Sequence, residues 1–259
     1  MKKYTLLLMI CLFSGRLFAQ NTHFTTSGTI EFEKKVNMYA IITKMMKEEK
    51  DNEAWYGPAF EAYKKTNPQF KTLNSTMVFT NNKTYFAPVV SNTPPGNGWF
   101  NDMPQGQQIN TIYTDLNTNL YTAGKKVFDE LFVVKDTARK ITWKITDETR
   151  EIAGYTCRRA NAIVMDSVYV VAFYTDEIPV SGGPESFTGL PGMILGVALP
   201  HDNVTWFATK VTDTPIAETS LKIPAKGKQV NFASLTATLK SAMKNWGEYG
   251  KKFFKIYLL

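Results

Sequence analysis

The sequence predicts a mainly β protein with a minor α component: a single strongly curved antiparallel sheet, or half-barrel, with one or two covering helices. First, short segments with strand-like patterns follow one another along most of the chain. Second, turn residues such as Asn81-Asn82 and Asn117-Thr118 separate neighbouring segments by hairpin distances. Third, only two stretches carry helical spacing. Because parallel strands need long crossover connections, these short connections favour antiparallel pairing.

The predicted strands are recognised by alternation of apolar and polar side chains. Residues 29–33 and 140–146 alternate regularly, so each predicts a half-buried strand with one face toward solvent. Similar β patterns predict further strands at residues 76–80, 83–88, 112–115, 119–122, 130–135, 157–164, 168–174, 193–199 and 203–211.

The predicted helices lie in two amphipathic stretches. Residues 36–65 carry apolar side chains at helical spacing, with a weak break at Gly57-Pro58. Residues 232–254 form the second stretch. We expect both to cover a face or an edge of the sheet. Residues 91–108 are rich in Pro and Gly and predict a long loop around Trp99 and Phe100.

The N-terminus has the pattern of a cleavable secretory signal. Lys2-Lys3 is followed by an apolar segment at residues 6–13 and by Leu17-Phe18-Ala19. We expect cleavage near Ala19, a single domain over residues 20–259, and a periplasmic or secreted location. The apolar run is broken at residues 14–16 and is shorter than the roughly 20 residues that span a bilayer, so no transmembrane span is predicted.

The charge balance argues against nucleic-acid binding. The chain has 30 basic and 23 acidic residues, a net charge of +7. Removal of residues 1–19 takes away Lys2, Lys3 and Arg16 and leaves 27 basic residues against 23 acidic ones, a net charge of +4. A balance this small, with both signs interspersed, is typical of a solvated surface. We expect no nucleic-acid partner.

Motifs for metal or cofactor chemistry are missing from the sequence. The chain has two histidines and no zinc-ligand spacing, so we predict no metal site and no cofactor. A copper site built from methionines stays open as an alternative. Methionines at helical spacing are more often core residues. The methionines that could form such a site are Met38, Met45, Met46 and Met193.

No catalytic residues are predicted. The nearest match to a serine nucleophile elbow, at residues 183–189, is out of register. Glu185 stands beside Gly and Pro, which is typical of a solvated turn carboxylate. A hydrolase that uses Glu185, Ser186 and His201 remains a weaker hypothesis. We therefore favour a non-enzymatic function and leave an enzymatic one open.

Cys157 is the single cysteine beyond the signal segment. Arg158 and Arg159 follow it, and nearby cations lower the pKa of a thiol. Strand alternation places only Arg159 on the same face as the sulfur. We favour a buried core cysteine over a reactive thiol and keep both interpretations.

The segment 175–195 crowds Gly and Pro between two apolar strands, which indicates a fixed, non-repetitive backbone path. We expect it to close one end of the half-barrel, with Leu190 and Ile194 turned inward. Aromatic side chains on such shaped loops suggest an exposed binding surface. The candidate binding residues are Trp99, Phe100, Phe187, Leu190, Pro191 and Gly192.

The same segment resembles the GLPGLI family of exported bacterial proteins, through Gly189-Leu190-Pro191-Gly192-Met193-Ile194. The resemblance extends upstream through residues 154–160 and 174–179 and to the opening strand at residues 28–32. Phe173 and Met193 depart from the usual family residues but keep an apolar group. The resemblance implies an exported β-rich protein of largely unknown activity and supplies no catalytic residues.

Together these features predict an exported binding or accessory protein of the bacterial cell envelope, without enzymatic activity. Its expected partner is an apolar ligand, a peptide, or an outer-membrane or periplasmic protein. The alternative is a periplasmic factor that handles thiols or copper through Cys157.

Overall fold

The computed structural model describes residues 24–49, 53–90, 98–107 and 109–259, so the predicted signal segment lies outside the described residues. The strands form one open 12-stranded sheet in the order β12-β6-β5-β4-β3-β2-β1-β11-β10-β9-β8-β7. Every neighbouring pair is antiparallel except β12 with β6. The mainly β prediction is confirmed. The strands are β1 (Gly28–Asn37), β2 (Phe70–Thr80), β3 (Lys83–Pro88), β4 (Thr111–Asp115), β5 (Leu120–Val127), β6 (Glu130–Thr137), β7 (Lys144–Ile152), β8 (Tyr155–Val164), β9 (Val168–Thr175), β10 (Met193–Leu199), β11 (Val204–Asp213) and β12 (Lys228–Val230).

Several predicted strands are shorter than the observed ones: residues 29–33, 76–80 and 119–122 correspond to the longer strands β1, β2 and β5. The predicted strand at residues 140–146 begins at Lys144 and continues to Ile152, into a mostly polar segment that carries little apolar alternation. The sequence pattern does not predict the three-residue strand β12, because it is too short to show a period and pairs with β6 far away in sequence.

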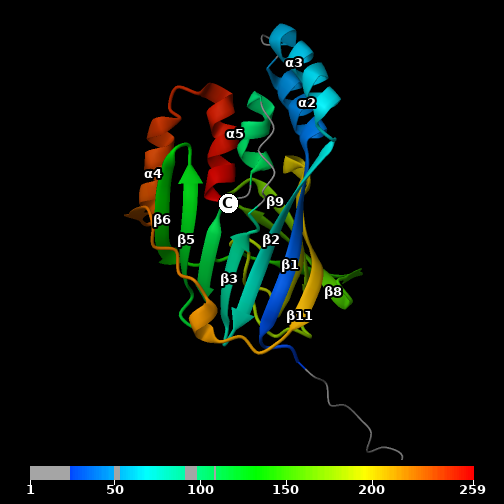
Figure 1. Cartoon of the computed structure of the whole chain (residues 1–259), viewed down its shortest axis with the longest axis vertical. Coiled ribbons are helices and arrows are strands. Elements are labelled where there is room, and N and C mark those ends of the chain that lie inside the picture. The colour runs from blue at the N-terminus through cyan, green and yellow to red at the C-terminus, as the bar shows by residue number, and fades with distance from the viewer. Residues whose placement is uncertain (1–23, 50–52, 91–97, 108) are drawn as a thin grey trace, which may run out of the picture.

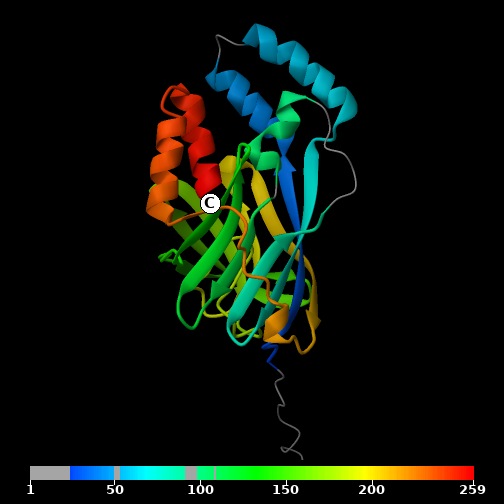
Figure 2. The ribbon, with the colours of Figure 1, turned by 60° about the vertical axis from the view of Figure 1, so that its left-hand side comes forward.

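The sheet is strongly curved, and its concave side encloses the core (Figures 1 and 2). Alternate residues of β1 supply that side: Ile30, Phe32 and Val36 are buried, whereas Glu31 and Lys35 are exposed. The period of two along a strand explains this division.

Each predicted helical stretch folds as two helices. The first contains α2 (Met38–Glu48) and α3 (Glu53–Thr66), so the break follows Glu48 and Pro58 lies inside α3. The second contains α4 (Phe232–Ala242) and α5 (Gly247–Leu258). Residues 243–246 separate the second pair. Gly247, the first residue of α5, has a φ of +56°, a left-handed conformation that glycine adopts readily.

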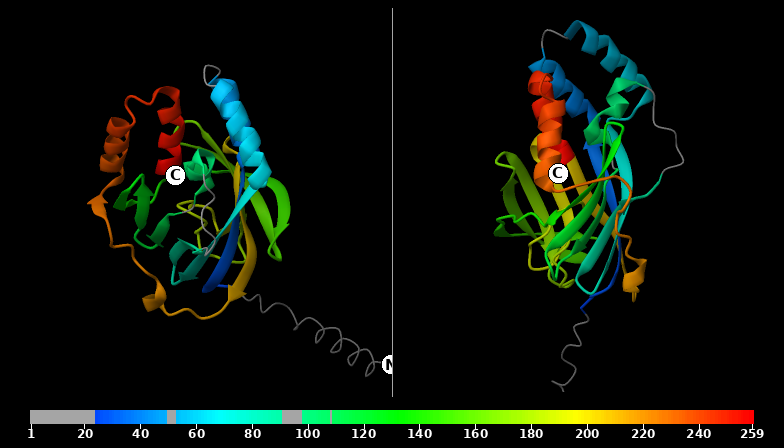
Figure 3. Two further views of the ribbon diagram at one scale, coloured as in Figure 1. Left: turned by 45° about the horizontal axis from the view of Figure 1, so that its top comes forward. Right: turned by 90° about the vertical axis from the view of Figure 1, so that its left-hand side faces the viewer.

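The helix pairs stand at one end of the sheet, and the C-terminal end of α5 reaches the concave side (Figures 1 and 3). Two short 3₁₀ turns, η2 (Trp99–Asp102) and η3 (Pro104–Gly106), lie between the two pairs. Within the described residues, no helix is long and apolar enough to cross a membrane.

The segment between β9 and β10 lies inside the half-barrel and forms part of the core. Ile178, Val180, Phe187 and Leu190 are buried in it. The indole Nε1 of Trp143 donates a hydrogen bond to the main-chain oxygen of Thr188 (2.9 Å). The expected inward orientation of Leu190 and Ile194 is confirmed by their burial.

Candidate functional site

A small cavity on the concave side, here called the inner cavity, brings together side chains from distant strands. Lys34 lies on β1 and Lys125 on β5, four positions apart in the strand order. Neighbouring strands are about 4.8 Å apart, so a flat sheet would separate β1 and β5 by about 19 Å. Sheet curvature instead places both lysines in the lining of one cavity of about 60 Å³. Its polar lining includes Lys34, Gln105, Asn110, Lys125, Glu185 and Trp206.

Both lysines occupy positions that the strand pattern assigns to the core. Lys34 follows Ile30 and Phe32 on the buried face of β1, and it is 5% exposed. Lys125 lies between Ala123 and Val127 on the buried face of β5 and is 4% exposed. Full burial of an ammonium group is rare because it removes the group from water.

Each ammonium is held by a main-chain oxygen. Lys34 Nζ donates to the oxygen of Gln107 at 2.6 Å, and it also lies 5.1 Å from the centre of the Trp206 ring. Lys125 Nζ donates to the oxygen of Tyr257, near the end of α5, at 3.2 Å. Burial lowers the pKa of each lysine to about 8.

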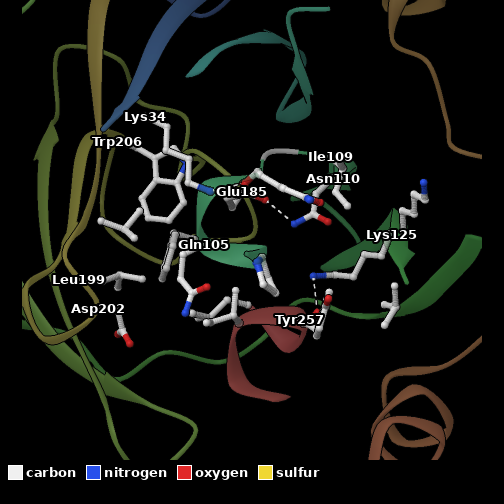
Figure 4. Close-up of a pocket in the computed structure, with 18 residues that line it drawn as sticks. Lys34, Gln105, Ile109, Asn110, Lys125, Glu185, Leu199, Asp202, Trp206 and Tyr257 are labelled. Carbon is white, nitrogen blue, oxygen red and sulfur yellow. Dashed lines mark hydrogen bonds between the residues drawn. The ribbon is translucent and has the colours of Figure 1, made fainter. Parts of the chain in front are cut away.

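Glu185 supplies a carboxylate to the same cavity from the segment between β9 and β10. Asn110 Nδ2 donates to its Oε2 at 3.0 Å. Glu185 is 7% exposed, so the prediction of a solvated turn residue is wrong. Its φ of +52° is an uncommon conformation for a non-glycine residue, with a strain of about 1–3 kcal/mol. Figure 4 shows the two lysines approaching the Glu185–Asn110 pair from different strands, with Trp206 beside Lys34.

Two further polar atoms of the inner cavity lack partners. Among the described residues, Trp206 Nε1 and Gln105 Oε1 are buried and make no hydrogen bond. Most buried polar groups in native proteins are hydrogen-bonded, so such atoms at a cavity are candidates for ligand contact.

A larger cavity, here called the outer cavity, adjoins the inner one and has a volume of about 430 Å³. Lys125 and Leu259 line both cavities. The apolar part of the lining of the outer cavity includes Ile112, Tyr121, Ala123, Phe232 and Leu258. Its polar part includes Thr114, Asp136, Arg139, Ser186 and Thr188. Exposed residues at its far end, Asn119, Thr137 and Lys140, indicate that it opens to solvent.

The predicted binding residues are divided between places that do not adjoin. Trp99 is 38% exposed, as expected, and packs edge-on against Trp55 with ring centres 5.7 Å apart. Phe100 is buried against Tyr63, so its predicted exposure is wrong. Its ring lies against the rings of Tyr56 and Tyr63 on α3, which shield it from solvent.

Phe187 is also buried, contrary to the expected exposure, because its segment folds into the half-barrel. It nevertheless lines the inner cavity. Leu190 belongs to the core, and Pro191 is exposed at the turn. Gly192 is buried where a Cβ would lie 2.0 Å from the oxygen of Thr175, so it permits a close backbone approach. A binding role for these residues stays a prediction.

Cys157 is fully buried on β8. Burial, together with the charges of Glu151 and Glu177, raises the pKa of its thiol to about 12. A thiol with a raised pKa is a poor nucleophile and a poor metal ligand. The favoured interpretation of a core cysteine agrees with this position.

The methionine-copper and hydrolase hypotheses find little geometric support. Met38, Met45 and Met193 are buried in the core. Ser186 Oγ donates to the main-chain oxygen of Leu259 (3.0 Å), and the ring of His201 lies 6.1 Å from that of Tyr169. Within the part of the chain that the structure describes, no cluster of three or more His, Cys, Asp and Glu side chains could hold a metal ion.

Lys34 and Lys125 are missing from the sequence-based candidates, although a signal for them exists. Each is the first lysine of a Lys-Lys pair, and continued strand alternation places it on the apolar face. The predicted strands at residues 29–33 and 119–122 end before these positions. The prediction therefore does not say whether the two lysines lie on the buried or the exposed face of the sheet.

The comparisons with known proteins concern family and fold. Residues 162–196 match the family model described as "Protein of unknown function (Porph_ging)". This segment contains the end of β8, β9, the largely buried connection 176–192 and the start of β10. No match carries the GLPGLI name, so that resemblance stays a prediction. A search of curated proteins found no match.

Among solved structures, one of PNGF-II in space group C2 aligns with a TM-score of 0.51 and 13% identity, covering 82% of this chain and 32% of that one. PNGF-II in space group P21 aligns at 0.49 and 15%, covering 82% and 33%. An uncharacterized conserved protein from Thermus thermophilus aligns at 0.37 and 5%, covering 80% and 92%. The chain thus spans about a third of the length of PNGF-II, and the first alignment indicates a shared fold alone.

Proposed function

We propose that this chain is an exported, non-enzymatic binding protein of the bacterial cell envelope whose concave side holds a small apolar ligand. The observation that carries the proposal is the outer cavity of about 430 Å³, which opens to solvent. More of its lining surface is apolar than polar, although charged residues such as Asp136 and Arg139 also line it. Small-molecule sites commonly have volumes of about 300–1,000 Å³ and a mainly apolar lining with few polar groups.

A small ligand fits this geometry better than a peptide or a folded partner. The cavity lies inside the curved sheet, between β4, β5 and the end of α5, rather than along an exposed edge. Peptides are usually bound along sheet edges or in long grooves. The alternative thiol or copper function is weakened by the burial of Cys157.

We further propose that the chain is a GLPGLI-type protein. The signature at residues 189–194 falls inside the segment matched by the family model, which supports a family relationship. The predicted secretory signal supports a periplasmic or secreted location.

A fluorescence titration with N-phenyl-1-naphthylamine, a neutral apolar probe, tests the binding function. We expect saturable binding with one probe per chain. Ala138→Phe narrows the outer cavity and should weaken binding about tenfold, since a lost apolar contact of this size is worth about 1–2 kcal/mol.

The matched control is Ala87→Phe, because Ala87 is also half-buried but lies on β3 outside the lining of either cavity. Thermal melts establish that both variants fold. Absence of saturable binding to the wild type, or equal effects of the two variants, would overturn the proposal.

A further inference from the structure

The two buried lysines of the inner cavity have hydrogen-bonding capacity that the protein does not use. An ammonium group carries three donors. Among hydrogen bonds between described residues, Lys34 Nζ and Lys125 Nζ each make one, to a main-chain oxygen. Each retains donors at a place where water is largely excluded, so an additional acceptor there would be bound strongly.

The charge of the inner cavity is also incompletely balanced. Glu185 interacts electrostatically with both lysines, but within the described residues it makes no ion pair with either, and its carboxylate accepts from Asn110. Asp202 also lines the cavity, but the charges that act on it are those of other basic groups: Lys44, His201 and Lys255. Among the described groups whose charges act on the two lysines, Glu185 is the one carboxylate, whereas Lys71 and Arg139 are further cations. The pKa values of Lys34 and Lys125, about 8, leave both mainly charged at neutral pH.

An independent observation points to the same kind of ligand atom. Trp206 Nε1 is buried, is a donor only, and has no partner among the described residues. Its ring lies against Lys34. Two ammonium groups and an indole N–H present more donors than the single unpartnered buried acceptor of the described lining, Gln105 Oε1, and this excess suits an acceptor-rich group such as a carboxylate.

The sizes of the two cavities define how such a ligand would lie. The inner cavity, of about 60 Å³, has room for a head group, whereas the outer cavity, of about 430 Å³, has room for an apolar body. Lys125 borders both and lies where the two parts of the ligand would meet.

We propose that the ligand is an apolar carboxylate, a molecule of the long-chain fatty acid type, whose head group is bound by Lys34 and Lys125 while its chain occupies the outer cavity. This inference rests on the proposed binding function and specifies its ligand class. Lys34 and Lys125 are then ligand-binding residues, Glu185 and Asn110 form the polar floor of the site, and Trp206 adds a neutral donor.

The test compares decanoate with decan-1-ol as competitors of N-phenyl-1-naphthylamine at pH 7. The two compounds share a chain and differ in the charge of the head group. A cavity without cations favours the alcohol, because a carboxylate must lose its hydration. We therefore expect the wild type to bind decanoate at least about tenfold more tightly than decanol, as charge-assisted hydrogen bonds allow.

Lys34→Met and Lys125→Met should each reduce this preference for decanoate over decanol about tenfold or more. Lys35→Met is the matched control, since Lys35 is the exposed neighbour of Lys34 on the same strand, and it should retain the wild-type preference.

The outcomes separate the two proposals. The carboxylate inference is overturned if the probe binds the wild type and the variants but the wild type shows no preference for decanoate. It is also overturned if both lysine variants keep the wild-type preference. In either case the proposed apolar binding function still stands. No saturable probe binding overturns both. If a lysine variant does not fold, the preference of the wild type decides the matter alone.

Discussion

The wall of the half-barrel formed by β9 and β10 is densely packed, whereas β1 and β5 each place an ammonium group on the concave side. In β10, six of seven residues are buried, and the segment that precedes it fills the interior with Phe187 and Leu190. Lys34 and Lys125, by contrast, interrupt otherwise apolar rows. The segment rich in Gly and Pro, which is the most conspicuous feature of the sequence, therefore forms part of the packed core. The regular strands β1 and β5 supply the polar groups that could bind a ligand.

The largest expected effect concerns the packed wall. In Gly192→Ala, the new Cβ would lie 2.0 Å from the oxygen of Thr175 and 3.0 Å from the Cα of Asp176, so it would clash with backbone atoms. We expect the free energy of unfolding to fall by about 3 kcal/mol or more, or the protein not to fold. Chemical denaturation measures this change. Pro191→Ala is the control and should change stability by less than about 1 kcal/mol, because Pro191 is exposed. If both substitutions changed the free energy of unfolding by equal, small amounts, the turn at residues 191–192 would not be a rigid part of the packed core.

Replacement of either buried lysine, on β1 or β5, should raise the free energy of unfolding instead of lowering it. Lys34→Met or Lys125→Met replaces a desolvated ammonium with an apolar group of similar length, and each variant retains the positive charge of the other lysine near Glu185. We expect each ligand-free variant to gain about 1–3 kcal/mol in unfolding free energy at pH 7. Denaturation of Lys35→Met, on the exposed face, should give a change of less than about 0.5 kcal/mol.

The stability difference between the lysine variants and the wild type should depend on pH. Burial lowers the pKa of Lys34 and Lys125 to about 8, so between about pH 8 and 10.5 the folded wild type binds fewer protons than the unfolded chain. Wild-type stability should therefore rise with pH in this range relative to the variants, and their advantage should shrink. The charged or titratable groups near the two lysines include Glu185, Asp202, Tyr257, Lys71, Lys126 and Arg139. Destabilised variants at pH 7 would mean that the ammonium groups mainly stabilise the fold.

The smallest expected effect concerns Cys157, on β8 beside the packed wall. Its burial and raised pKa predict no reaction with dithionitrobenzoate in the native protein over a period in which the unfolded chain reacts completely. Absorbance of the released thiolate measures the reaction. Rapid native modification would contradict the packing of this wall and revive the thiol hypothesis.

Much of the fold could be predicted because strand alternation and turn residues are local signals. The strands at residues 83–88 and 193–199 have the predicted bounds. The inner cavity could not be predicted, because it depends on the curvature that brings β1 to β5. The buried position of Glu185 depends on the path of an irregular segment, for which the sequence offers no period.

The most direct test of the account is a crystal structure of the protein with bound 10-bromodecanoate, in which anomalous scattering locates the bromine. We predict the carboxylate within about 3.2 Å of Lys125 Nζ and directed toward Lys34. The bromine should lie in the outer cavity near Ile112 and Ala123. A carboxylate at the solvent rim with the bromine inside, or a ligand bound outside both cavities, would contradict the account.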